Sequence, residues 1–157
     1  MIPFNQDFRD LLSCLLAADV RFLLVGGYAL AFHGHPRGTK DMDVFVEPTP
    51  ENANRVMHAL QAFGAPTQHV TVNDFADPHT VFQIGVPPRR IDLVCSIDGV
   101  TFDQAWPSRQ VMELDDMEVP VIGLQAMLTN KESTGRLNDQ ADAEIIRGLI
   151  AKQSRRL

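Results

Sequence analysis

Three aspartates have the spacing of a site that handles charge. Asp41 and Asp43 lie two residues apart at the start of a predicted strand over 42–46, and Asp92 interrupts the apolar segment 90–94. Because side chains alternate along a strand, the side chains of Asp41 and Asp43 should lie on the same face of the sheet. Neighbouring carboxylates raise each other's pKa unless a cation lies between them, and such oxygen ligands suit Mg²⁺ or Mn²⁺. Three carboxylates from two strands could hold two ions about 4 Å apart, as in phosphoryl transfer.

A glycine pair points to the same chemistry. Gly26-Gly27 follows the apolar run 22–25, a predicted buried strand, and precedes a predicted short helix over 28–33. Backbone N–H groups at the start of a helix attract anions. A missing Cβ would also let a phosphate approach the backbone.

Each of these features also has a structural interpretation. An Asp-x-Asp pair is often a solvated strand end, and two glycines after a strand are often a tight turn. Asp92 could pair with Arg89 or Arg90. Only the combination of the glycine pair, Asp-x-Asp and a lone aspartate in a later strand favours a metal site.

Several better-known motifs are excluded. The sequence has no G-x-G-x-x-G, and the segment 34–40 imitates a P-loop with the wrong spacing and order. Asp41-Met-Asp43 lacks the glycine and distal glutamate of an EF-hand. His33 and His35 lack an H-E-x-x-H context, so they do not predict a metal centre. Two distant cysteines predict buried free thiols.

Hydrophobic periodicity predicts an α+β fold, with helices packed on a mixed β-sheet. No regular βαβ alternation is present, so we do not expect a doubly wound sheet. A loop is expected over 67–78. The predicted helices cover 5–18, 28–33, 49–63, 124–132 and 138–152, and the predicted strands cover 22–25, 42–46, 80–86, 90–97, 110–114 and 118–122.

Length and charge limit the functional classes. With 157 residues the chain fits one domain, and its formal charge of −6 argues against a protein that coats nucleic acid. No apolar run is long enough for a membrane span, and the N-terminus lacks the features of a secretory signal. We therefore expect a cytoplasmic protein without a membrane partner.

Together these residues resemble the DNA polymerase β-type nucleotidyltransferase superfamily. The resemblance rests on Gly26-Gly27, on Arg37-x-Thr39-x-Asp41-x-Asp43 and on Arg90-Ile-Asp92-Leu. The segment from Leu124 to Asp142 is similar to the tail motif of the small AbiEii-like and minimal nucleotidyltransferases, several of which belong to toxin–antitoxin systems. The resemblance covers about residues 22–147.

The resemblance implies one nucleotidyltransferase domain over 1–157, with a core at about 20–122 and a helical segment over 123–157. Such an enzyme moves an NMP from an NTP to an acceptor hydroxyl and releases pyrophosphate, using two Mg²⁺ or Mn²⁺ ions. The implied metal ligands and catalytic residues are Asp41, Asp43 and Asp92. The implied nucleotide-binding residues are Gly26, Gly27, Arg37, Thr39 and Lys131.

The chain departs from the superfamily pattern at two positions. Tyr28 follows the glycine pair where many members have serine, and Asn138 stands where the tail often has lysine. Lys131 could also be an ordinary solvated cation. Arg136 and Asp139 could equally form an ion pair that joins the last two helices.

The acceptor is not specified by these motifs. A tRNA end, a protein hydroxyl and a small molecule all suit the chemistry, and the partner could be an antitoxin or a second copy of the chain. The rival hypotheses are a non-catalytic nucleotide or metal sensor on the same fold and a subunit that depends on a partner.

Overall fold

Two short apolar segments form the centre of the sheet. The computed structural model describes residues 4–36, 38 and 41–155, and in it β1 (Phe22–Val25) pairs antiparallel with β2 (Met42–Val46). Every residue of β1 is buried, as expected for a strand covered on both faces. This pairing places Val25, at the end of β1, opposite Asp43.

The remaining strands extend the sheet in both directions. The order is β3-β4-β2-β1-β6-β5, with β3 at Val81–Ile84, β4 at Ile91–Val94, β5 at Gln110–Leu114 and β6 at Met117–Val121. The β2–β4 and β1–β6 pairs are parallel, and the other pairs are antiparallel. The expected mixed sheet and α+β class are therefore confirmed.

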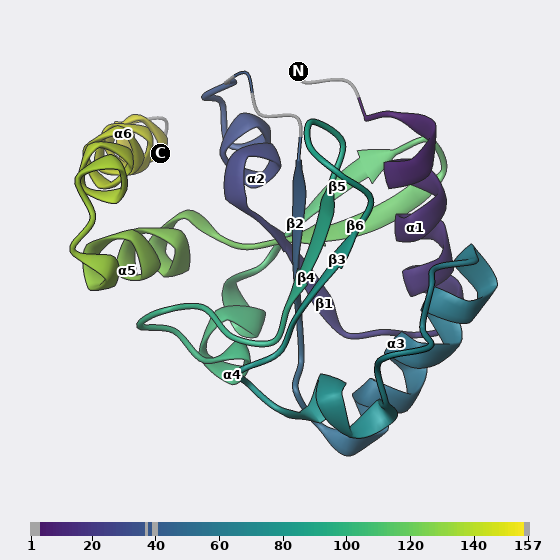
Figure 1. Ribbon diagram of the computed structural model, residues 1–157. Coiled ribbons are helices and arrows are strands. Elements are labelled where there is room, and N and C mark those ends of the chain that lie inside the picture. The colour runs from purple at the N-terminus through teal and green to yellow at the C-terminus, as the bar shows by residue number, and fades with distance from the viewer. Residues whose placement is uncertain (1–3, 37, 39–40, 156–157) are drawn as a thin grey trace.

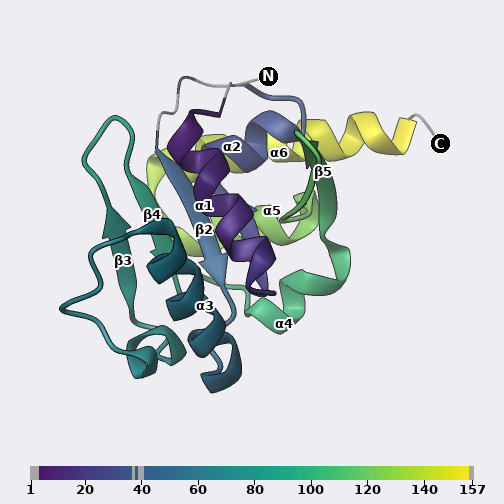
Figure 2. The same ribbon diagram turned by 90° about the vertical axis from the view of Figure 1, so that its right-hand side faces the viewer.

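One face of the sheet is covered by α1 (Gln6–Ala17) and α3 (Pro50–Phe63), which lie side by side in Figures 1 and 2. Asn5 caps α1 by accepting a hydrogen bond from the Phe8 backbone N–H at 2.9 Å. Thr49 caps α3 in the same way, and Gly64 ends α3 with a positive φ of 90°. The sequence signals predicted both helices.

A buried amide ties α3 to the central strands. The Asn52 side chain donates to the backbone carbonyls of Arg21 and Glu47, both at 2.9 Å, and accepts from the Arg21 N–H at 2.7 Å. All of these groups lie at the ends of β1 and β2 that are remote from Asp43. The buried bonds fix the position of the two strands that carry the candidate site.

The other face is covered incompletely. In Figure 1, α2 (Gly26–Phe32) lies at the end of β1, while α5 (Leu124–Thr134) and α6 (Leu137–Arg155) stand away from the sheet on the same side. Gly135, with φ of 72°, turns the chain between α5 and α6. Asp43 and Lys131, two of the polar residues expected to do chemistry, line the space that this arrangement leaves.

Three local features differ from the sequence-based expectation. Residues 67–78, expected as a loop, include the 3₁₀ helix η1 (Val72–Ala76), which a Thr71–Asp74 capping box starts. A short helix α4 (Phe102–Ala105) and a 3₁₀ turn η2 (Trp106–Ser108) fill a segment for which no element was predicted. Helix α2 begins at Gly26 rather than after the glycine pair.

The core is continuous and apolar, and its largest fully buried side chains include Phe8, Phe22, Phe45 and Phe75. Both cysteines are free thiols; Cys95 is buried and Cys14 is half-buried. Within the described residues, none of the helices has the length and apolar character that a membrane span requires.

Candidate active site

Two of the three aspartates are neighbours on parallel strands. β2 and β4 pair in a register that sets Asp43 beside Asp92. Their flanking residues Met42, Val44 and Ile91 are buried in the core, so alternation turns both carboxylates to the face that carries α2. The sheet therefore brings together two aspartates that are 49 positions apart in the sequence.

Asp43 lies in a strongly negative environment. Burial raises the pKa of its carboxyl to about 6, and the charges of Asp92 and Asp41 contribute to the rise. Arg90 and, more weakly, Lys131 oppose it. An excess of negative charge around a buried carboxyl is the condition that a bound cation relieves.

Arg90 occupies the space between the other two aspartates. Its Nε and Nη2 donate to the two oxygens of Asp92 at 2.8 and 3.1 Å. Its backbone N–H donates to Asp41 Oδ1 at 3.0 Å, and Nη2 lies 3.9 Å from Asp41 Oδ2. The pairing of Asp92 with Arg90, one of the structural interpretations of the sequence, is therefore observed.

These contacts determine how a divalent cation would fit. Asp41 and Asp43 offer the hard oxygen donors that Mg²⁺ and Mn²⁺ take, and Asp43 has the unfavourable charge that an ion would relieve. Asp92 has both oxygens engaged by a guanidinium. Across the part of the chain that the structure describes, no three Asp, Glu, His or Cys side chains are arranged to hold a metal ion. The residues thus fit an ion on the Asp41–Asp43 side of the site.

Gly26 makes room for the Asp43 carboxylate. It has a positive φ of 69°, and a Cβ built on it would overlap Asp43 Oδ2. The missing Cβ therefore gives space to an aspartate side chain, and a phosphate beside the glycine pair stays a prediction. Gly27 is the second residue of α2.

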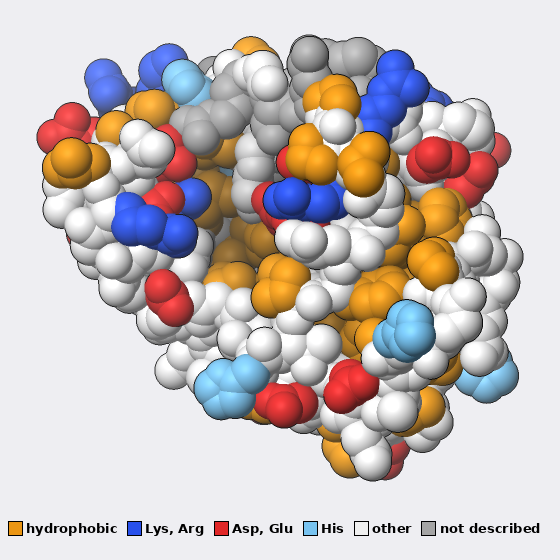
Figure 3. Space-filling view, in the orientation of Figure 1, with side chains coloured by type: hydrophobic (Ala, Val, Ile, Leu, Met, Phe, Trp, Pro, Cys, Tyr) orange, Lys and Arg blue, Asp and Glu red, His pale blue; other side chains and the backbone are white. Residues whose placement is uncertain are grey.

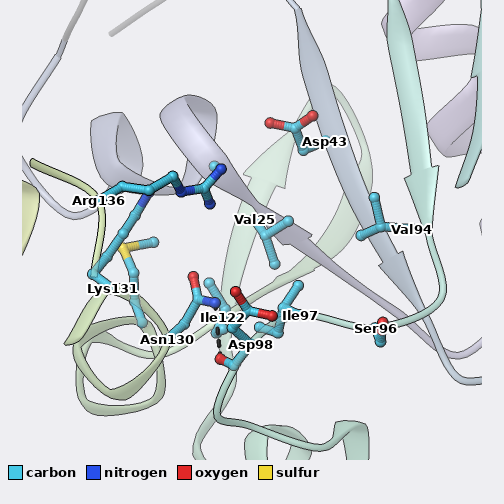
Figure 4. Close-up of a pocket in the computed structure, with 12 residues that line it drawn as sticks. Val25, Asp43, Val94, Ser96, Ile97, Asp98, Ile122, Asn130, Lys131 and Arg136 are labelled. Carbon is cyan, nitrogen blue, oxygen red and sulfur yellow. Dashed lines mark hydrogen bonds between the residues drawn. The ribbon is translucent and has the colours of Figure 1, made fainter. Parts of the chain in front are cut away.

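A cleft of about 280 Å³ opens in front of Asp43 and Gly26. The space-filling view shows a hollow with a hydrophobic floor between the α5–α6 side and the rest of the molecule (Figure 3). Asp43 projects from one wall, while Lys131 and Arg136 come from the opposite wall (Figure 4). The cleft therefore sets carboxylates against cations across a space into which a small ligand can enter.

Lys131 is held in place by two buried carboxylates. Its Nζ lies 3.1 Å from Asp139 Oδ1 and 3.3 Å from Asp142 Oδ2, and both aspartates are less than 10% exposed. Thr134 Oγ1 donates to Asp139 at 2.7 Å, and Arg136 Nε donates to it at 2.8 Å. These hydrogen bonds and the Lys131 ammonium hold the pKa of Asp139 below its usual value despite burial. Lys131 is thus a positioned cation. The Arg136–Asp139 ion pair is present, but Arg136 lies between the two helices, so α5 is joined to α6 by Lys131 and Thr134.

The comparisons with known proteins concern the fold. No protein-family model matches the sequence, and no curated protein matches it. A solved structure from Thermotoga maritima, described as a "putative nucleotidyltransferase", superposes with a TM-score of 0.55 over 92% of this chain and 90% of that one, at 16% identity. This chain has the nucleotidyltransferase fold. The expected AbiEii-like branch stays a prediction.

Within this nucleotidyltransferase fold, some expected site residues lie elsewhere or in other roles. Arg37 and Thr39 fall outside the described residues. Tyr28, at the position where the superfamily that the sequence resembles often has serine, is buried against the rings of Phe4 and Phe8. His33 Nε2 lies 2.7 Å from the carbonyl oxygen of Ile122, so this histidine links α2 to the segment before α5.

Sequence reasoning missed the end of the cleft that is remote from Arg136. Asp98 and Asn130 line it, and Asn130 donates to the Asp98 carbonyl at 3.0 Å. Figure 4 shows both side chains beside the apolar residues Ile97 and Ile122. The Asp98-Gly99 turn was recognised only as a turn. Because nothing in the sequence pairs residue 98 with residue 130, only the packing of α5 shows that they share a wall.

Proposed function

We propose that the protein is a metal-dependent nucleotidyltransferase that moves an NMP from an NTP to an acceptor hydroxyl and releases pyrophosphate. The observation that carries this proposal is the cleft in which Asp43, beside Asp92, faces Lys131 and Arg136. Carboxylates suited to a cation on one wall, with cations suited to phosphate on the other, match the charge distribution of a metal–triphosphate complex.

The two walls would have different tasks. Lys131, held by Asp139 and Asp142, would place a fixed positive charge beside the triphosphate, and the exposed Arg136 guanidinium could pair with phosphate oxygens. Asp41 and Asp43 would hold a Mg²⁺ or Mn²⁺ ion, with Asp92 as the third carboxylate of the site. When bound, the metal supplies neutralisation of the charge on the α-phosphate and the leaving pyrophosphate.

The cleft also suggests where the nucleoside lies. Its floor beyond the carboxylates is apolar, with Val94, Ile97 and Ile122 among the lining residues. A planar base can lie on such a floor, while Asp98 and Asn130 offer hydrogen-bond partners at the rim. The phosphates would then point toward Gly26 and Lys131.

Transfer can be tested with each of the four α-labelled NTPs, incubated with Mg²⁺ and either total RNA or cell lysate. We expect label to pass to a macromolecule or small acceptor with the wild-type protein and not with Asp43→Asn or Asp41→Ala. The labelled product identifies the acceptor. Absence of any labelled product, with nucleotide binding intact, would contradict an enzymatic role.

A second candidate is a non-catalytic nucleotide-binding or metal-binding module on the same fold. The observation that favours it is the bidentate Arg90–Asp92 pair, which engages the third carboxylate of the site. A module of this kind would bind Mg²⁺ and NTP but give no labelled product. The incubation described above therefore separates the two functions.

The resemblance to AbiEii-like proteins extends the proposal to a toxin whose activity an antitoxin partner neutralises. Induced expression in a bacterial host would then arrest growth in a manner that depends on the site. We expect arrest with the wild-type chain and normal growth with Asp43→Asn at equal protein levels. Equal growth of both strains would contradict the toxin role without affecting the proposed chemistry.

A further inference from the structure

Within the described residues, Arg90 is the cation whose side chain lies between the site carboxylates. Arg90 lies immediately before β4, two positions from Asp92, and its hydrogen bonds show that both side chains lie on the same side of the sheet. The guanidinium then spans both oxygens of Asp92 and reaches toward Asp41. The contact with Asp92 is the largest cause of the raised pKa of Arg90, so the two charges stabilise each other.

In this geometry Arg90 and a metal ion would compete for the same oxygens of Asp92. In a two-ion site, Asp92 would have to supply at least one oxygen to a cation shared with Asp41 or Asp43. Both Asp92 oxygens already accept hydrogen bonds from the guanidinium. A divalent ion placed between Asp92 and Asp43 would also face the positive charge of Arg90 at short range.

We infer that Arg90 is an internal cation that competes with a divalent metal ion for Asp92. In the protein without nucleotide, an ion is held through Asp41 and Asp43, and Asp92 becomes a metal ligand only when the guanidinium moves away. This inference rests on the proposed function, because it concerns the same carboxylates. It assigns Arg90 a positioning role that sets metal affinity rather than a role in the chemical step.

The neighbouring arginine provides a matched control. Arg89 is exposed and lies in the bend that precedes β4, next to Arg90 in the chain. Arg89→Gln removes the same charge from the same loop but keeps the hydrogen bonds between Arg90 and Asp92. A difference between the two variants therefore reports the local contact and not the net charge of the protein.

The test is a Mn²⁺ titration of the nucleotide-free protein, followed by electron paramagnetic resonance of the unbound ion. We expect Arg90→Gln to bind Mn²⁺ at least tenfold more tightly than the wild type, and Arg89→Gln to stay within twofold of it. Adding Asp92→Asn to Arg90→Gln should remove the gain, because the freed ligand is lost. Equal Mn²⁺ affinity of Arg90→Gln and the wild type would overturn the inference.

Two further measurements distinguish a failure of this inference from misfolding of the variant and from a failure of the proposed function. Thermal unfolding shows whether Arg90→Gln is folded; if it is not, Arg90→Lys replaces it, because a lysine is a point charge that does not span both oxygens. With Arg90→Lys we expect at least a threefold gain in Mn²⁺ affinity, and no gain overturns the inference.

If nucleotide still binds with Mg²⁺ while Arg90 variants leave Mn²⁺ affinity unchanged, only this inference fails. If wild type and variants bind neither Mn²⁺ nor nucleotide, the proposed function fails with it.

Discussion

Asp43 is a single residue whose charge lowers the stability of the folded protein. Its carboxyl is largely buried beside two other aspartates, and its pKa is raised to about 6. A folded state that binds a proton more tightly than the unfolded chain loses stability as the pH rises between the two pKa values. The fold therefore retains a charge that costs free energy at neutral pH, as functional sites often do.

Replacing this charge should stabilise the metal-free protein. We expect Asp43→Asn to raise the free energy of unfolding by about 2 kcal/mol at pH 8, because the amide is neutral and nearly the same size. The gain should shrink as the pH falls below about 6 and vanish near pH 4, where the wild-type carboxyl is protonated. Urea unfolding at several pH values measures it.

The matched control is Asp116→Asn, which removes an exposed carboxylate in the β5–β6 turn. Its effect should stay within about 0.5 kcal/mol at every pH, as for most surface substitutions. A destabilised Asp43→Asn at pH 8 would contradict the account of an uncompensated charge.

At the scale of elements, the start of α2 and the second residue of β2 form one unit. Gly26 turns the chain from β1 into α2 with a left-handed φ, and the Asp43 side chain occupies the space where a Cβ would stand. Gly26 and Asp43 thus form a single packing requirement. A side chain at position 26 would have to displace the Asp43 carboxylate.

Gly26→Ala should therefore cost more than backbone strain alone. Gly64 is a matched control, because it also has a positive φ but open space where a Cβ would be. We expect Gly64→Ala to lower the free energy of unfolding by about 1 kcal/mol and Gly26→Ala by about 3 kcal/mol or more. Chemical denaturation of both variants gives the difference, and equal losses would show that Asp43 does not press on Gly26.

The joint between α5 and α6 depends on Lys131. Removing its ammonium would leave Asp139 and Asp142 buried with less compensation. We expect Lys131→Met to lower the free energy of unfolding by about 3 kcal/mol. Arg147→Met, which breaks an exposed pair with Glu132, should cost less than about 0.5 kcal/mol. If the two variants lose the same stability, Lys131 is an ordinary surface cation.

The elements that could be predicted are those with local signals. Apolar runs marked β1 and β2, and Asn5, Thr49 and Gly64 marked helix ends, so these boundaries were found within a residue or two. The helix α4 was missed because four residues give almost no periodicity. The capping box at Thr71 was overlooked, so η1 was expected as loop.

The sequence predicted which residues form the site better than it predicted which of them contact each other. Asp-x-Asp and the lone Asp92 identified the carboxylates, since such residues are costly in a sheet without a partner. Whether Asp92 pairs with Arg90 or with a metal was left open by the sequence, because both satisfy the charge. Asp98 and Asn130 had no local signal at all, and only the packing of α5 against the Asp98-Gly99 turn brings them together.

At the scale of the whole molecule, the cleft lies between two parts with different tasks. The sheet presents carboxylates, and the α5–α6 pair presents Lys131 and Arg136 across about 280 Å³ of open space. The formal charge of −6 is compatible with a phosphate ligand because these two cations act locally. The similarity to the Thermotoga maritima structure covers both parts, since it spans 92% of this chain.

The central claim is that this cleft binds an NTP together with a divalent cation. Isothermal titration of each NTP into the wild-type protein tests it most directly, once with Mg²⁺ and once with EDTA, alongside Asp43→Asn and Asp116→Asn. We expect at least one NTP to bind at least tenfold more tightly with Mg²⁺, in the wild type and Asp116→Asn but not in Asp43→Asn. Nucleotide affinity that is absent, or that is the same with and without Mg²⁺, would contradict the account.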